Sequence, residues 1–76
     1  MTDRAALDEE LTRLHGQTAH AARLSVLHET AAAEFAAGPE EARFHLTHAW
    51  VYALVDGEET RIGVLERQLR AIGGLA

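Results

Sequence analysis

The 76-residue chain contains no cysteine, so neither disulfide bonds nor a thiolate zinc site can stabilise it. A chain this short buries only about 60% of the surface that its unfolded form exposes. We therefore expect marginal stability, and self-association is the simplest remaining way to bury more surface. The absence of cysteine also suits a reducing compartment, so the expected location is the cytoplasm.

The chain also lacks lysine: its basic residues are seven arginines, set against twelve acidic residues, and its net charge is −5. Because phosphate neutralisation dominates affinity for nucleic acids, an acidic chain with dispersed arginines is not expected to bind them. A helix-turn-helix regulator that places Arg61, Arg67 and Arg70 on DNA phosphates is therefore the weakest of three functional hypotheses. The abundance of alanine and arginine is typical of GC-rich bacterial genomes.

Long hydrophobic runs are missing as well. The longest uncharged stretch, residues 44–55, has twelve residues, whereas a membrane-spanning helix needs about 20 apolar residues. The opening MTDRAALDEE is acidic and lacks the apolar centre of a signal peptide. We therefore expect a soluble protein without a membrane partner.

The only proline, Pro39, follows Gly38, which predicts that one helix ends at the glycine and the next begins at the proline. Asp56 and Gly57 predict a tight turn in which Asp56 caps the following helix. Gly16 interrupts the first half at a point where the apolar stripe rotates. Two helices joined there are favoured, and one long kinked helix is the alternative.

These boundaries and the helical spacing of apolar residues predict a single all-α domain of three or four antiparallel helices. No segment has the pattern of a convincing strand. The expected helices span residues 3–15, 18–37, 40–55 and 58–72, and the last two form a helix-turn-helix hairpin.

The hairpin over residues 39–72, which contains HAWVYALVDGEETRIGVLERQLRAIGG, resembles a tetratricopeptide-type helical hairpin. The similarity consists of an aromatic-rich first helix, Gly57 at the turn, an apolar residue five positions later at Ile62 and a closing Leu69. The second helix departs from the repeat, which has alanine at the position of Ile62 and a bulky apolar residue at that of Glu66. The two halves of the chain are also offset by 41 residues instead of 34. What the resemblance implies is a protein-binding role without catalysis.

On the helix expected over residues 40–55, Glu41, His45, His48 and Tyr52 follow one another at steps of four, three and four, so they share one side. Histidines at positions i and i+3 can share a divalent metal such as zinc, with Glu41 as a third ligand. If this helix packs antiparallel to the preceding one, His28 lies near the level of His48 and can join them. The favoured interpretation is that these histidines sit at the edge of the core and form hydrogen bonds there.

The same helix has apolar residues on two opposite sides. One side carries Leu46, Ala49 and Ala53, and the other carries Phe44, Val51 and Val55. A chain of this length struggles to cover both sides. The second side is therefore predicted, together with Leu24 and Leu27 of the preceding helix, to be shared with a partner, most simply in a two-fold homodimer.

No catalytic pattern is present. The only serine, Ser25, lacks a glycine-flanked elbow, and the glycines form neither a dinucleotide-binding motif nor a P-loop. The leading hypothesis is therefore a non-catalytic, cofactor-free module for protein interaction or oligomerisation. A metal-binding helical protein that uses His45 and His48 ranks second.

Overall fold

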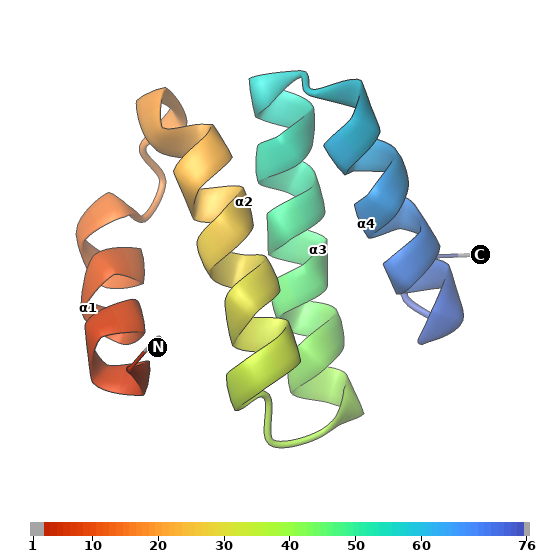
Figure 1. The fold of residues 1–76 in the computed structure, drawn as a ribbon, viewed down its shortest axis with the longest axis horizontal. Coiled ribbons are helices and arrows are strands. Elements are labelled where there is room, and N and C mark those ends of the chain that lie inside the picture. The colour runs from red at the N-terminus through yellow and green to blue at the C-terminus, as the bar shows by residue number, and fades with distance from the viewer. Residues whose placement is uncertain (1–2, 76) are drawn as a thin grey trace.

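The computed structural model describes residues 3–75 and confirms the all-α prediction, since this part of the chain contains helices and no strand. The helices are α1 (Arg4–Leu14), α2 (Ala21–Thr30), α3 (Pro39–Asp56) and α4 (Glu59–Ala71). A 3-10 turn, Thr18–His20, leads into α2, and a π-helical turn, Ala31–Phe35, continues it. The four helices stand side by side in sequence order (Figure 1).

Two glycines in the left-handed region separate the helices. Gly16, at a φ of 73°, follows α1, and Gly57, at 83°, ends α3. Other residues rarely adopt this conformation, so glycine is the natural choice at both turns. Residues 4–35 therefore form two helical segments, as Gly16 predicted. The predicted cap was wrong by two positions: α3 continues through Asp56, and Glu58 caps α4 by accepting hydrogen bonds from the backbone N–H groups of Thr60 and Arg61.

The junction between α2 and α3 also differs from the prediction. The α2 segment ends at Phe35 in the π-helical turn, earlier than expected, and Gly38 is extended at a φ of −174°. Gly38 is thus the residue before α3, which begins at Pro39 as predicted. Proline suits this first position because the N–H group it lacks has no helical partner there.

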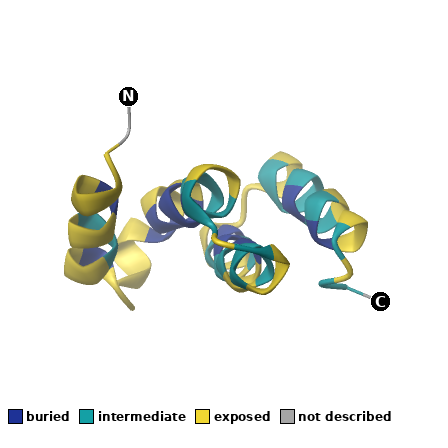
Figure 2. Ribbon diagram, turned by 90° about the horizontal axis from the view of Figure 1, so that it is seen from below, coloured by how far each residue is buried: buried dark blue, intermediate teal, exposed yellow. Residues whose placement is uncertain are grey.

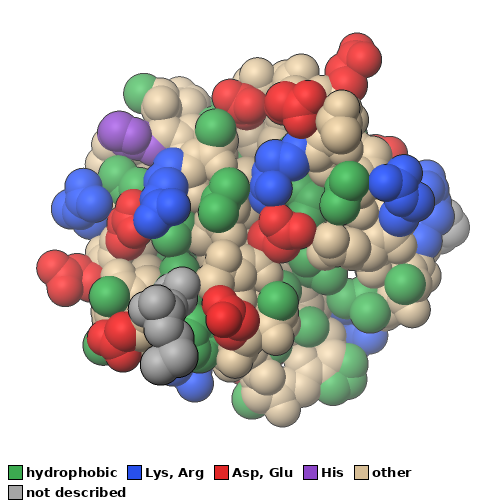
Figure 3. Space-filling view, viewed as in Figure 1, with side chains coloured by type: hydrophobic (Ala, Val, Ile, Leu, Met, Phe, Trp, Pro, Cys, Tyr) green, Lys and Arg blue, Asp and Glu red, His purple; other side chains and the backbone are tan. Residues whose placement is uncertain are grey.

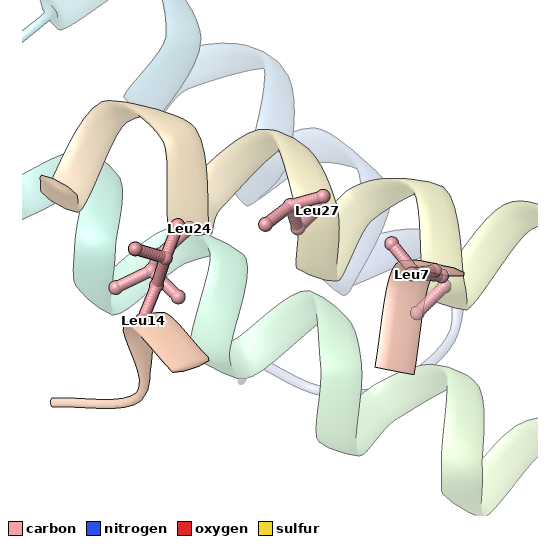
Figure 4. Close-up of a cluster of buried hydrophobic side chains, with 5 residues drawn as sticks. Leu7, Leu14, Leu24 and Leu27 are labelled. Atoms are coloured by element: carbon pink, nitrogen blue, oxygen red, sulfur yellow. The ribbon is translucent and has the colours of Figure 1, made fainter. Parts of the chain in front are cut away.

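Apolar side chains form two clusters along the row of helices. The first cluster, between α1 and α2, contains Leu7, Leu14, Leu24, Leu27 and Ala31 (Figure 4). The second, between α3 and α4, contains Leu46, Ala49, Ala53, Leu65 and Leu69. The prediction that Leu24 and Leu27 face a partner was wrong: α1 folds back over them, and they are only 0% and 4% exposed.

A polar bridge ties α2 to α4. The buried Ser25 hydroxyl donates to the Ala49 carbonyl at 2.7 Å and accepts from the Arg61 guanidinium at 3.1 Å. Arg61 also pairs with Glu29 at 2.9 Å, and Gln68 donates to the other Glu29 oxygen at 3.1 Å. Among the described residues no buried side-chain nitrogen or oxygen lacks a partner. Three helices are thereby joined into one layer.

The row of helices is not flat. Seen end-on, α3 is displaced to one side of α2 and α4, which leaves part of its surface open (Figure 2). The face visible in Figure 3 carries charged side chains of both signs. No helix between residues 3 and 75 has both the length and the apolar character to cross a membrane.

Candidate functional site

The most prominent surface feature is a row of side chains on α3, here called the α3 stripe: Phe44, His48, Val51 and Val55. Steps of four, three and four residues place them on one side of the helix. Phe44, Val51 and Val55 are 55%, 45% and 52% exposed. Single exposed apolar residues are common on proteins, whereas a continuous row is typical of an interaction surface.

The opposite side of α3 belongs to the core, where Leu46, Ala49 and Ala53 are buried. The two apolar sides predicted from the sequence therefore have different environments: one is buried within the chain, and the other lies open. Leu54, 46% exposed, and the exposed Thr47 flank the stripe. No charged residue occurs between Arg43 and Asp56, so the whole stripe lies within an uncharged part of the helix.

A histidine cluster formed by His28, His45 and His48 adjoins the stripe and shares His48 with it. The ring centre of His28 lies 5.3 Å from that of His45 and 5.0 Å from that of His48. The Nδ1 atoms of His28 and His45 are 3.1 Å apart, so one of them carries the hydrogen and the other accepts it. The antiparallel packing of α2 and α3 thus brings His28 to the level expected from the sequence.

Burial governs the charge of two of these histidines, His28 and His45. His28 is only 6% exposed, and burial together with the neighbouring imidazoles of His48, His45 and His15 lowers its pKa from 6.5 to about 4. Burial also lowers the pKa of His45, and the Glu41 carboxylate opposes that change. His28 is consequently neutral at pH 7, which suits a hydrogen bond between two imidazoles.

Phe44 links the stripe to the cluster. Its ring centre lies 4.3 Å from that of His48, and it meets the His45 ring edge-on at 5.3 Å. The Nδ1–H group of His48 donates to the Phe44 carbonyl at 2.8 Å. The exposed Phe44 ring therefore packs against the imidazole rings of His45 and His48.

Tyr52 completes the arrangement from the other end of the cluster. Its ring is stacked on His28, with centres 5.8 Å apart. Its hydroxyl accepts a hydrogen bond from the Gly16 backbone N–H at 3.1 Å, which connects the cluster to the turn between α1 and α2. The sequence placed Tyr52 on the correct side of the helix but contained no signal for its contact with Gly16.

The residues predicted to bind a metal come together only in part. His28, His45 and His48 are neighbours, whereas the Glu41 carboxylate accepts a hydrogen bond from the Ala37 backbone N–H at 3.2 Å. Within the part of the chain that the structure describes, no group of three or more histidine, cysteine, aspartate or glutamate side chains is arranged to hold a metal ion.

The three arginines of the DNA-binding hypothesis also have different environments. Arg61 is engaged with Ser25 and Glu29 in the polar bridge, whereas Arg67 and Arg70 are exposed. Sequence reasoning missed this bridge. The available signal was that Ser25 lies one position after Leu24 and three before His28, on the buried side of α2.

Comparison of the chain with protein-family models, curated proteins and solved structures finds no match. The resemblance of residues 39–72 to a tetratricopeptide hairpin gains no support from it.

Proposed function

We propose that this protein is a small helical interaction module that self-associates through the α3 stripe and carries out no catalysis, in the cytoplasm. The observation that supports this proposal is the exposed apolar stripe on the side of α3 opposite the core. A second copy of the chain is the occupant we favour, since an uncharged apolar surface is matched by an identical one. Two-fold pairing is also the commonest form of self-association.

The energetics favour a weak dimer. Burying a large apolar side chain completely contributes about 1.5–3 kcal/mol. Phe44, Val51 and Val55 are each about half exposed, so each has roughly 1 kcal/mol left to gain, and two copies together gain roughly 6 kcal/mol. Association itself costs about 4–15 kcal/mol. These three side chains of each copy therefore leave at most about 2 kcal/mol of net binding, so other contacts along the paired helices must add to them, and we expect a dissociation constant no tighter than the millimolar range.

One feature supports the non-catalytic part of the proposal. The hydroxyl of the only serine, Ser25, is fully buried and already donates to Ala49 and accepts from Arg61, so it is not placed as a nucleophile.

Sedimentation equilibrium up to about 2 mM protein tests the proposal, with the Val51→Ser variant and a matched Val26→Ser control. Val26 is an exposed valine of α2 that lies outside the stripe and lines a groove beside α1. We expect wild type and V26S to dimerise alike and V51S to dimerise roughly tenfold more weakly or worse, because each dimer loses two buried methyl-bearing side chains. A monomeric wild type, or equal weakening by both substitutions, would contradict the proposal.

A further inference from the structure

We infer that two copies pair their α3 helices antiparallel about a two-fold axis, with Phe44 against the partner's Val55 and His48 against the partner's Val51. This inference rests on the proposed self-association and adds its orientation and register. It follows from the positions of the stripe residues along α3 and from the way α3 projects from the layer.

The spacing of the stripe residues along α3 is the same when it is read from either end of the helix. The midpoint of the stripe lies between residues 49 and 50, and Phe44 and Val55 are equally far from it on opposite sides. His48 and Val51 are likewise equally far from it. At 1.5 Å per residue, the outer pair lies roughly 8 Å and the inner pair roughly 2 Å from the midpoint. A two-fold axis through this midpoint therefore places every stripe residue opposite another stripe residue.

The chemistry of the facing pairs favours the antiparallel direction. It sets the large Phe44 ring against the smaller Val55 and the His48 imidazole against the apolar Val51. A parallel pairing in register would instead set the two Phe44 rings together at one end of the interface and only the smaller Val55 side chains together at the other, so the two helices could not pack closely along their whole length. Antiparallel helices also align their dipoles favourably.

The shape of the layer allows the two helices to meet. Because α3 is displaced from α2 and α4, its exposed side projects beyond them (Figure 2). Thr47 and Leu54 lie along the same flank of the stripe and are both exposed. A two-fold axis perpendicular to the helices keeps each flank on its own side, so Thr47 falls beside the partner's Leu54, offset by roughly 3 Å along the axis.

The same geometry separates identical positions. Thr47 lies roughly 8 Å along the axis from the partner's Thr47, and Leu54 roughly 14 Å from the partner's Leu54. Because the chain contains no cysteine, single cysteines at these positions report the register without background. Neither substitution removes a stripe residue.

The experiment oxidises Thr47→Cys, Leu54→Cys and their equimolar mixture in a glutathione buffer at about 1 mM protein, and mass spectrometry counts the three disulfide products. A mixture of Thr12→Cys, on α1, with L54C is the control for random collisions. We expect the T47C–L54C product to exceed both products of identical chains, as well as the collision control, at least fivefold.

The outcomes separate this inference from the proposal beneath it. If the disulfide between two T47C chains or two L54C chains forms as much as or more than the mixed product, the pairing is parallel and only the inferred orientation is overturned. The inferred orientation is also overturned if the protein sediments as a dimer but the mixed product forms no faster than in the collision control. A wild-type protein that sediments as a monomer at every concentration would overturn both.

Discussion

Acidification should destabilise the protein through His28, which lies beneath the surface between His45 and His48. Its pKa falls from 6.5 in the unfolded chain to about 4 in the folded protein. Between these values the unfolded chain binds more protons than the folded one, so the free energy of unfolding decreases as the pH falls. The stabilising contribution of neutral His28 is complete above about pH 6.5 and is lost progressively down to about pH 4.

The size of the effect follows from this difference in pKa. One pKa unit corresponds to about 1.4 kcal/mol, so His28 accounts for roughly 3 kcal/mol over the whole interval. Between pH 7.5 and pH 5 it accounts for about 2 kcal/mol. The lowered pKa of His45 acts in the same direction. A small domain with only a few kcal/mol of total stability should lose much of it in this range.

Urea denaturation followed by circular dichroism at pH 7.5, 6 and 5 measures this loss. In His28→Gln the buried group no longer titrates, so most of this dependence of about 2 kcal/mol should disappear. In the control His20→Gln, which alters an exposed histidine of the 3-10 turn, the dependence should remain.

Two results would refute this reasoning. One is a pH dependence in H28Q equal to that of the wild type, because the titrating group would then lie elsewhere. The other is a wild type that loses less than about 0.5 kcal/mol down to pH 5. That outcome would mean that His28 and His45 share a proton between their Nδ1 atoms and keep the hydrogen bond in the charged form.

Two further predictions concern the interior and the metal hypothesis. Ser25→Ala should lower the free energy of unfolding by about 1–2 kcal/mol, because the Arg61 guanidinium loses a buried hydrogen-bond acceptor. The control Thr60→Ala, which alters an exposed residue, should change this free energy little. Chemical denaturation measures both variants. Adding a tenfold excess of zinc should leave the thermal midpoint unchanged, because the described residues contain no set of three metal-binding side chains. If zinc instead raised the thermal midpoint by several degrees, that result would support a metal site at His45 and His48.

The helix boundaries could largely be predicted from the sequence because the signals that end helices are local. Gly16, Gly57 and Pro39 each act through their own backbone conformation, and α1, α3 and α4 begin and end within about two residues of the expected positions. The end of α2 was less predictable. No glycine or proline marks the π-helical turn after Thr30, and Phe35 at its end packs against the first apolar cluster, a contact that is not local.

The environment of each apolar face could not be predicted in the same way. Periodicity correctly indicated that Leu24 and Leu27 share a side of α2, but it does not determine which element covers that side. In the structure α1 covers it. The same reasoning applied to α3 identified Phe44, Val51 and Val55, which no other helix covers. Which side is covered depends on the path of the chain after Gly16.

The α3 stripe and the histidine cluster cannot vary independently, because His48 belongs to both and the Phe44 ring packs against His45 and His48. A second chain seated on Phe44 would also remove water from around His48 and His45. Removing water disfavours the protonated imidazole, so association and protonation oppose each other, and by linkage each weakens the other to the same extent. The proposed dimer should therefore be tightest where His45 is neutral, in the same pH range in which the folded chain itself is most stable.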